Sequence, residues 1–508
     1  MIGSTPASDR TSLVGRAFAP VDISGLVYFR VAFGLVMVGW IAKYWTGGLI
    51  DGLYIAPTFH FHYYGFEWIE PLPGRAMYGY FAFLGLCGLL MAVGCFYRVA
   101  AILFAIAFTY LFLIDKALYQ NHYYLILLLG WVMVVLPVDR AWSVDAWWRN
   151  WRTCRTAPAW ALWLVRFQIG APYFFGGLAK LNSDWLLGEP MRTALGERSG
   201  FWLIGPLLGQ QWCLWLFVYG GLLFDLLVVP ALLWRRTRPF AFALAVCFHL
   251  VNAIVFNIGV FPWLMIAATV IFFPPDWPRR LARRVRPLGG WSRGKAEPPV
   301  QATGVSPDVS TPATQPLLLA AVSVFVLLQI ALPLRHIFSE GDPSWTEEGH
   351  YFAWHMMLRG KQCGIRYMAT NPDTHSTGTV DLRPYLTTFQ AARFGRDPRM
   401  VHQLARRIAA DLRDVGVDNV EVRVWALVSL NGRKPQFMID PRVDLGTEPI
   451  TWQQPEWILP LVEPLRDEPW DVKLVEWEKH LDLDDMLRRQ VGDNWANPDG
   501  RAPRADSG

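Results

Sequence analysis

Residues 99–136 read VAAILFAIAFTYLFLIDKALYQNHYYLILLLGWVMVVL, and this stretch decides the class of the protein. Two apolar runs, 99–114 and 123–136, are long enough to lie in a bilayer. Between them stand Asp115, Lys116, Asn121 and His122. Polar side chains at that depth are costly, so a cluster of them indicates a functional site.

Apolar runs of this kind recur along the chain, which has 508 residues, 53% of them hydrophobic, and 26 tryptophans. A helix needs about 20 apolar residues to cross a bilayer. The runs predict spans at residues 26–45, 77–96, 99–114, 123–136, 159–181, 212–234, 240–255, 259–273 and 317–332. The expected fold class is therefore a polytopic α-helical membrane protein with about eight or nine transmembrane helices, followed by a soluble mixed α/β extracytoplasmic domain.

Arginine clusters set the predicted orientation. They lie at residues 140–155, 235–238 and 279–286, and the positive-inside rule places all three loops in the cytoplasm. The loops share one side only if residues 240–273 cross twice, which favours two helices there. The same parity places the N-terminus inside, and it puts both residues 115–122 and everything after residue 332 on the outer side.

The composition divides the chain into six segments. These are a cytoplasmic N-terminal tail (1–22), a transmembrane helical catalytic core (23–274), a basic, proline-rich cytoplasmic linker (275–316), a last transmembrane helix (317–338), an extracytoplasmic α/β domain (339–494) and a flexible tail (495–508). In the α/β domain, residues 420–430 and 436–439 are predicted strands around an Asn431-Gly432 turn. Residues 398–415 and 470–491 are predicted amphipathic helices.

Charge and cysteine usage exclude some partners. The net charge of +5 lies in loops and is too small to indicate a nucleic-acid partner. The six cysteines form no CxxC pair, so neither a zinc site nor a disulfide framework is expected, and the thiols are predicted to be buried and inert. We expect no metal ion.

The segment around Lys116 resembles the active-site segment of vitamin K-dependent γ-glutamyl carboxylases, in which a lysine in an Asp-Lys…Asn-His context is the catalytic base. The resemblance implies that Lys116 is the base, with Asn121 and His122 beside it. Only a neutral amine can take a proton, and burial favours that form. If the helix continues past Lys116, Gln120 shares its face, and Asp115 points elsewhere. Alternatively, Lys116 extends to the lipid headgroups.

Two intramembrane stretches are also similar to the family. In residues 166–185, the resemblance implies that Arg166, Gln168 and Tyr173 bind the cofactor; Lys180 and Asp184 are expected to form an interfacial ion pair. In residues 247–261 it implies that His249, Asn252 and Asn257 orient a quinol or the oxygen species. The alternative for these three is hydrogen bonding between helices. Asp225 is a further intramembrane carboxyl with a family counterpart.

Three stretches are expected on the outer side. His60 and His62, in an aromatic segment, could stabilise an oxyanion or belong to an interfacial aromatic girdle. Residues 440–444 reproduce an Asp-Pro-Arg-Val-Asp motif of the family, and the alternative for Asp440 and Arg442 is a structural salt bridge. The family's glutamate-binding segment corresponds to Trp354 and His355. Arg359 replaces a family histidine and could hold a carboxylate at two points.

The resemblance covers about residues 29–465. It implies that vitamin K hydroquinone (phylloquinol or menaquinol) enters from the bilayer and loses a proton to Lys116. The anion reacts with O2, the product removes the γ-proton of a peptide glutamate, and the carbanion captures CO2. The products are γ-carboxyglutamate and vitamin K 2,3-epoxide.

The expected partners are membrane lipid, a quinone and a glutamate-containing peptide or protein. The composition favours a bacterial cytoplasmic membrane with the C-terminal domain outside. About 65 residues follow the Asp-Pro-Arg-Val-Asp motif, fewer than in animal carboxylases, so substrate recognition is expected to differ. Two alternatives remain open: a quinol-oxygenating, epoxidase-type enzyme with a different carboxylation substrate or none, and a non-catalytic membrane scaffold.

Overall fold

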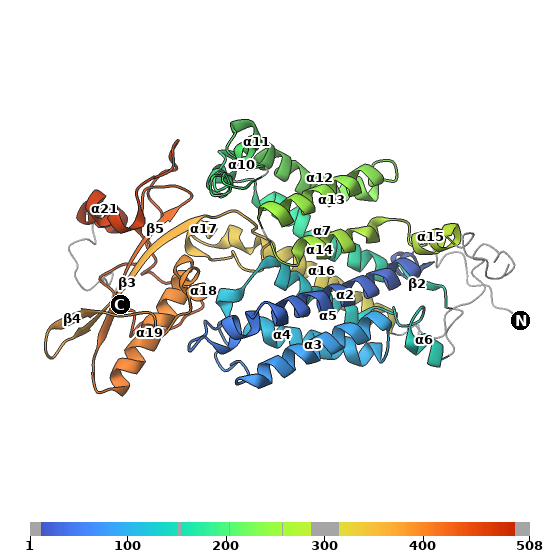
Figure 1. The fold of residues 1–508 in the computed structure, drawn as a ribbon, viewed down its shortest axis with the longest axis horizontal. Coiled ribbons are helices and arrows are strands. Elements are labelled where there is room, and N and C mark those ends of the chain that lie inside the picture. The colour runs from blue at the N-terminus through green and yellow to red at the C-terminus, as the bar shows by residue number, and fades with distance from the viewer. Residues whose placement is uncertain (1–11, 150–153, 203, 257, 286–313, 493–508) are drawn as a thin grey trace, which may run out of the picture.

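Apolar helices lie side by side in a bundle, and a domain containing a sheet lies at one end of that bundle (Figure 1). The computed structural model describes the chain except residues 1–11, 150–153, 203, 257, 286–313 and 493–508. The predicted flexible tail, 495–508, and most of the predicted linker lie outside the described residues.

Five helices in the described chain are long and apolar enough to cross a membrane. They are α2 (Ser24–Thr46), α3 (Arg75–Val93), the combined segment Gln211–Leu233 that ends in α12 (Gly221–Leu233), α13 (Arg238–Val255) and the segment Gln315–Phe338 that contains α16 (Gln315–Leu334). Four more apolar helices are α4 (Tyr97–Leu113), α5 (Asn121–Val135), α7 (Ala159–Ala179) and α14 (Phe261–Thr269). The count of eight or nine spans stays a prediction.

The segment 240–273 forms two helices, as the parity of the arginine loops required. Helix α13 ends at Val255, and α14 begins at Phe261 and continues as the short 3-10 helix η5 (Val270–Phe272). The bundle packs closely where small residues meet. A Cβ on Gly34 would lie 2.5 Å from the carbonyl oxygen of Gly88, so α2 and α3 approach through backbone contact at that point.

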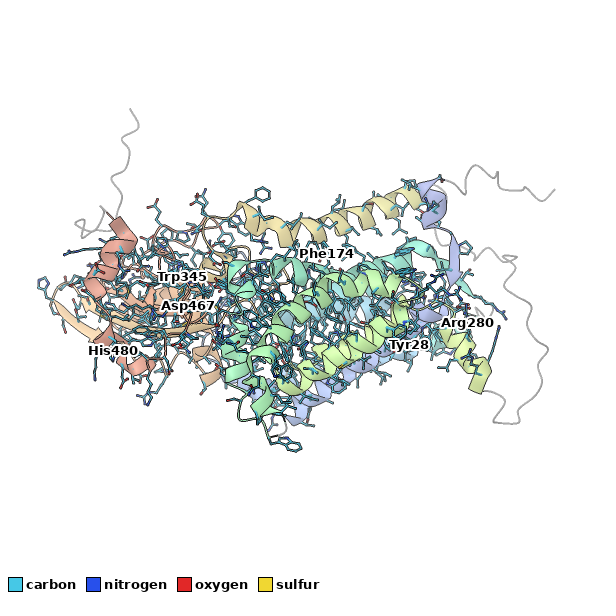
Figure 2. The ribbon with its side chains drawn as sticks, turned by 90° about the horizontal axis from the view of Figure 1, so that it is seen from above. Tyr28, Phe174, Arg280, Trp345, Asp467 and His480 are labelled. Atoms are coloured by element: carbon cyan, nitrogen blue, oxygen red, sulfur yellow. The ribbon has the colours of Figure 1, made fainter. Side chains whose placement is uncertain are left out.

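Helix α16 lies along the outside of the bundle (Figure 2). Within it only Gln329 and Pro333 are buried. The Gln329 amide nitrogen donates to the Tyr124 hydroxyl over 3.3 Å, which fixes the outer end of this helix to α5.

The end of the bundle away from the sheet domain contains α6, α15 and the start of α2 (Figure 1). Strands β1 (Pro20–Asp22) and β2 (Thr156–Pro158) pair there. The first part of the predicted linker is not irregular: residues Trp277–Val285 form helix α15. Arg279 pairs with Asp22 over 3.1 Å, so this helix is tied to the start of α2.

Lys116 and the C-terminal domain share the other end, as the parity argument predicted. That domain has a four-stranded antiparallel sheet in the order β4-β3-β5-β6. The strands are β3 (Lys361–Asn371), β4 (Ser376–Thr379), β5 (Glu421–Leu430) and β6 (Gln436–Phe437). Asn431 and Gly432, with φ of 52° and 74°, form the predicted turn after β5. Helix α19 (Pro398–Asp414) confirms the amphipathic prediction, with Val401, Leu404 and Ile408 buried against the sheet.

The prediction of one helix over residues 470–491 is wrong. The chain forms η9 (Leu474–Glu476), α20 (Trp477–His480) and α21 (Leu483–Val491). Leu481 is extended, with φ −114° and ψ 133°. Asp482 then accepts a hydrogen bond from the Asp485 amide over 3.0 Å. Because this carboxylate caps a new helix, it competes with continuation of the old one.

The remaining described elements are short. In the bundle they are α1 (Leu13–Ala17), η2 (Asp51–Ile55), η3 (Lys116–Leu118), α6 (Val144–Trp148), α8 (Ser183–Leu186), α9 (Met191–Gly196), α10 (Gly205–Leu208), α11 (Gln211–Trp215) and η4 (Leu216–Gly220). After α16 they are η7 (Arg335–Phe338), α17 (Pro343–Thr346), α18 (Thr388–Ala391) and η8 (Phe394–Arg396).

None of the six cysteines forms a disulfide, and only Cys87 and Cys213 are buried. The prediction of buried thiols is therefore wrong for Cys247, which is exposed, and for Cys95, Cys154 and Cys363, which are half-buried. Cys247 lies on the outward face of α13, where a bilayer rather than protein would cover it.

Candidate active site

Lys116 begins the single turn η3 between α4 and α5. No helix continues from Lys116 to Gln120, because the Gln120 backbone is extended, with φ −143° and ψ 143°. The prediction that Gln120 lies on the same helix face as Lys116 is therefore wrong. Asp115 caps the turn, and its carboxylate accepts from the Ala117 amide over 2.8 Å and from Gln390 over 2.9 Å. These contacts direct Asp115 away from the Lys116 amine.

The Lys116 amine points into the contact between bundle and sheet domain. Its side chain is 11% exposed, and its Nζ lies 2.6 Å from Oδ2 of Asp397. The amine also lies 4.4 Å from the ring centroid of Tyr351. This position differs from that of a lysine reaching lipid headgroups. The Nζ–Oδ2 distance of 2.6 Å is that of a charge-assisted hydrogen bond.

Asp397 and Tyr351 were not identified from the sequence. The Tyr351 hydroxyl donates to Oδ2 of Asp397 over 2.8 Å, so one oxygen joins the tyrosine and the lysine. Burial raises the pKa of Tyr351 well above its usual range, and the Asp397 charge adds to this. Asp397-Pro398 signals a helix start, and Asp397 does cap α19. Nothing in the sequence signals its contact with Lys116.

The loop that follows α17 is strained around the site. Four residues other than glycine have positive φ here: Glu347 (64°), Phe352 (61°), Trp354 (60°) and Met357 (60°). Such conformations persist only where surrounding contacts enforce them, and they concentrate at functional sites. The Tyr119 hydroxyl accepts from the Phe352 amide over 2.7 Å, and the Asn121 amide donates to the His355 carbonyl over 3.0 Å. The Lys116 segment therefore holds this loop.

The predicted substrate residues are largely enclosed. Trp354 is fully buried, and its ring centroid lies 5.0 Å from that of Tyr124. Burial lowers the pKa of His355 to about 3, with His336 and Arg359 adding to the effect. Its Nδ1 has no hydrogen-bond partner among the described residues. At neutral pH His355 is therefore an uncharged imidazole, and its Nδ1 is open to a further hydrogen bond.

Arg359 already holds a carboxylate, that of Glu347, over 2.6 Å. Lys361 binds the same oxygen over 2.7 Å and also donates to the carbonyls of Trp345 and Arg396. Burial raises the pKa of Glu347, but the charges of Arg359 and Lys361 outweigh it and bring the pKa below its usual value. Nε of Arg359 is thus already bonded to a carboxylate of the protein, where the sequence suggested a substrate carboxylate.

A second polar group lies inside the bundle. The Tyr173 hydroxyl lies 2.6 Å from Nε2 of His249. The ring of Phe261 lies between His249 and His122, with centroid distances of 5.9 and 6.0 Å. The structure therefore brings together the two predicted histidines and Tyr173, although they lie on three helices.

The other predicted cofactor residues have separate surroundings. Gln168 is fully buried, and neither atom of its amide has a partner among the described residues. Arg166 donates to the carbonyls of Ile271 and Phe273, each over 3.1 Å, so it caps the end of η5 rather than lining a site. Asn252 is half-buried near the end of α13. Asn257 lies outside the described residues.

The predicted ion pair between Lys180 and Asp184 is wrong. Lys180 pairs with Asp225 over 2.6 Å inside the bundle. Asp184 pairs with Arg433 at two points, 2.6 and 2.8 Å, and accepts from Asn431 over 2.8 Å. Asp184 lies in a new short helix, α8, whose start at Asn182 turns its side chain toward the sheet domain. Burial raises the pKa of Asp184, but the hydrogen bonds from Arg433 and Asn431 outweigh this effect and bring the pKa below its usual value.

The remaining candidates lie in the segment before α3 and after β6. His60 is buried with Nδ1 3.3 Å from Asp115, and its Nε2 is without a partner in the described chain. The His62 backbone exchanges two hydrogen bonds with the Gln403 side chain, which positions it beside α19. Asp440 and Arg442 form a two-point ion pair of 2.7 and 2.9 Å with each other, consistent with the structural alternative.

An aromatic cavity lies on the bundle side of the Lys116 turn. Its lining is almost wholly apolar, and consists of Trp40, Tyr54, Phe108, Leu111, Phe112, Leu118, Tyr119 and Tyr123. Its volume is about 10 Å³, room for about one water. The lining suits a flat apolar ring, whereas the volume requires these side chains to move apart. No three His, Cys, Asp or Glu side chains gather as a metal-binding set in the described residues.

Two family models match the chain. The HTTM domain model matches residues 18–277, which is 260 of the 508 residues. The model of the vitamin K-dependent gamma-carboxylase lumenal domain matches residues 314–464, which include the strained loop and α19. No solved structure matches the chain at a significant level.

Proposed function

Because the chain belongs to the vitamin K-dependent γ-glutamyl carboxylase family, we propose that it converts peptide glutamate to γ-carboxyglutamate, coupled to formation of vitamin K 2,3-epoxide. The observation that carries the proposal is the Lys116 amine, which is shielded from solvent between the matched bundle and the matched outer domain. O2 and CO2 are the co-substrates of this reaction.

Lys116 is the proposed base, and it must first lose its proton. Oδ2 of Asp397, 2.6 Å away, is placed to accept that proton. Transfer within the pair yields a neutral amine and a neutral acid, and two neutral groups are desolvated at lower cost than two charges. The Tyr351 hydroxyl, donating to the same oxygen, orients the carboxyl. Lys116 then takes a proton from the hydroquinone hydroxyl.

The aromatic cavity beside the Lys116 turn is the proposed position of the hydroquinone ring. When bound, the hydroquinone supplies the electrons and, with O2, the strong base that the carboxylation needs. His60, whose Nε2 has no partner among the described residues, is a proposed stabiliser of negative charge. Burial of the site excludes water that would quench a strong base. His122, His249 and Tyr173 are proposed to complete the polar lining deeper in the bundle.

We further propose that the bundle spans a bacterial cytoplasmic membrane with the sheet domain outside. The quinol then enters from lipid through the bundle, while the peptide arrives from the aqueous side at the strained loop. Trp354 and His355 are the proposed residues of that loop that meet the peptide glutamate, which requires the loop to open.

A second candidate is quinol oxygenation without carboxylation. The observation that favours it is Arg359, whose partner is Glu347 rather than a free space for a substrate carboxylate. The two candidates share Lys116, Asp397 and the aromatic cavity. They differ only at the strained loop.

One experiment separates the candidates. Purified protein in lipid nanodiscs receives vitamin K hydroquinone, labelled bicarbonate and a glutamate-rich peptide, and epoxide and peptide-bound label are measured separately. Carboxylation coupled to epoxide is the expected result. Epoxide alone would replace the first candidate by the second. If a folded sample forms neither product, the non-catalytic membrane scaffold is the remaining alternative.

A further inference from the structure

Strand β3 is open along part of one edge. Its β5 edge is paired from Lys361 to Thr370, while β4 covers the opposite edge only from Met368 to Asn371. The first half of the strand therefore has no neighbouring strand on that side within the described chain. An open edge presents backbone N–H and C=O groups that pair readily with another extended chain.

The alternation of the strand identifies the open groups. The Gly360 carbonyl faces the β5 side, where it accepts from the Asn431 amide. The Tyr367 carbonyl faces the open side, where the Val380 amide donates to it over 3.0 Å. Because the backbone groups of a strand alternate in direction from one residue to the next, the N–H and C=O groups of Cys363 and Ile365 point to the same open side as those of Tyr367. No hydrogen bond between described residues uses those four groups on that side.

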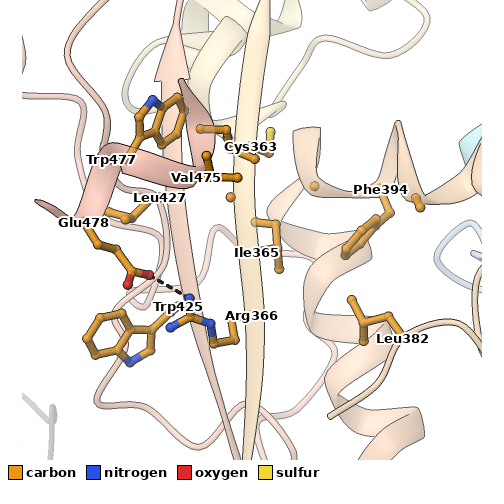
Figure 3. A pocket seen from close by; sticks show the side chains of 14 residues that line it. Cys363, Ile365, Arg366, Leu382, Phe394, Trp425, Leu427, Val475, Trp477 and Glu478 are labelled. Atoms are coloured by element: carbon orange, nitrogen blue, oxygen red, sulfur yellow. Dashed lines mark ion pairs between the residues drawn. The ribbon is translucent and has the colours of Figure 1, made fainter. Parts of the chain in front are cut away.

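A cavity of about 390 Å³ lies against this open edge (Figure 3). Phe394 and Leu382 lie on one side of β3, and Trp425 and Trp477 lie on the other (Figure 3). The lining thus comes from both faces of the sheet around that edge, so an occupant can reach both the backbone and apolar walls. At its mouth Val475 is 83% exposed, an apolar side chain that such an occupant would cover.

Residue contacts connect the walls of the cavity to the Lys116 site. The Phe394 ring, which lines the cavity, stacks on Phe61 with a centroid distance of 6.2 Å. The Phe61 carbonyl in turn accepts the Lys116 amide over 2.6 Å. Gly395 lines the cavity and Asp397 pairs with Lys116, with the exposed Arg396 between them. A basic side chain on this route favours an acidic occupant.

We propose that this cavity binds an extended, glutamate-containing peptide segment, which adds as a strand to the open edge of β3 at Cys363 and Ile365. Strand β4 already pairs with the far half of this edge, so the edge can accept a strand. The last backbone hydrogen bond from that segment to β3 is the one from Val380. Main-chain hydrogen bonds give such a site affinity with little sequence requirement, and the aromatic walls select apolar side chains. The identification of this peptide as the substrate rests on the proposed function. The binding itself does not require catalysis.

The test uses peptide binding without hydroquinone, so it does not depend on activity. A fluorescent ten-residue peptide of alternating valine and glutamate is titrated against the full-length protein in nanodiscs, with anisotropy as the readout. Two isomers carry N-methyl groups on alternate amides, one set in each isomer. In an added strand only one set of amides faces β3. We expect one isomer to lose at least tenfold in affinity and the other to bind as the parent does.

Protein variants provide the matched control. Ile365→Pro removes an amide that faces the cavity and not β5, and proline is tolerated at a strand edge. It should lower affinity at least tenfold while the thermal unfolding temperature remains near that of the wild type. Ile365→Val should bind normally. Equal binding of both methylated isomers, or unchanged binding by a folded Ile365→Pro variant, would overturn the proposal. A dimer that Ile365→Pro converts to a monomer, without probe binding, would assign the edge to a second copy and also overturn it.

Discussion

At the scale of single residues, the site depends on one oxygen atom. Oδ2 of Asp397 meets both the Lys116 amine and the Tyr351 hydroxyl. All three side chains are buried or nearly so, and a charge without its partner is strongly unfavourable in such surroundings. The pair therefore affects both stability and the proposed chemistry, and mutants must separate the two effects.

Lys116→Met should abolish epoxide formation and also lower the stability of the fold, because it leaves the Asp397 carboxylate unpaired. The cost of breaking a buried pair is about 3–5 kcal/mol. Adding Asp397→Asn should restore the thermal unfolding temperature but not the epoxide, since the base is still absent. Lys43→Met, at an exposed position, is the matched control and should change neither. Epoxide formation by the stabilised double variant would reject Lys116 as the base.

Asp397→Asn alone should lower the rate of epoxide formation by about tenfold or more. The amide can still accept the Tyr351 hydrogen bond and cap α19, but it cannot take the proton of Lys116. The rate and the thermal unfolding temperature are measured on the same preparation. An unchanged rate in the folded variant would show that Asp397 has a structural role only.

At the scale of elements, the bundle and the sheet domain are joined by side chains at both ends of the strained loop. Asn121 and Tyr119 hold the loop from the bundle. Asp184 in α8 joins Asn431 and Arg433 in the turn after β5. Asn431 therefore has two roles. Its backbone adopts the left-handed conformation that the turn requires, and its side chain donates to Asp184 in the bundle.

The Asp184 contact should be lost in acid. Because the folded pKa of Asp184 lies below its ordinary value of 3.8, its stabilisation is complete above that value and decreases as the pH falls through the folded pKa. Thermal unfolding of the wild type should therefore shift to lower temperature below about pH 4. Asp184→Asn should start lower at neutral pH and show a smaller acid shift, and Asp485→Asn, at an exposed position in α21, is the control. An unchanged acid shift in Asp184→Asn would assign the effect to other carboxyls.

At the scale of the whole molecule, the arrangement has two ends. One has α6 and α15, and the other has the sheet (Figure 1), with the Lys116–Asp397 pair between bundle and sheet domain. Side chains from the helical and sheet-containing parts complete the site together. Neither part alone contains the Lys116–Asp397 pair.

The proposed topology is tested by labelling. Single cysteines are introduced at His375, in the exposed turn between β3 and β4, and at Arg284, in α15. On intact cells a membrane-impermeant maleimide should modify the cysteine at position 375 and not the one at position 284, measured against the labelling of the native cysteines. After lysis both should react. The reverse pattern would place the sheet domain in the cytoplasm.

The sequence alone determined most of the architecture. Apolar length identified the helices, the arginine loops required two helices over residues 240–273, and the Asn431-Gly432 pair identified the turn after β5. These features depend on local composition and period, which the sequence displays directly. The family motifs indicated Lys116, Asn121, His122 and His249 as site residues, and their roles stay predictions.

Only the tertiary structure decided which side chains meet. The partners of Lys116, Lys180, Asp184 and Arg359 are Asp397, Asp225, Arg433 and Glu347, and only the last pair lies within one segment of the chain. These ion pairs form where helices and turns from distant segments of the chain meet. The sequence does not show which carboxylate lies beside which basic side chain. The fold decides this by burial, because a desolvated charge is tolerated only beside the particular partner that packing provides.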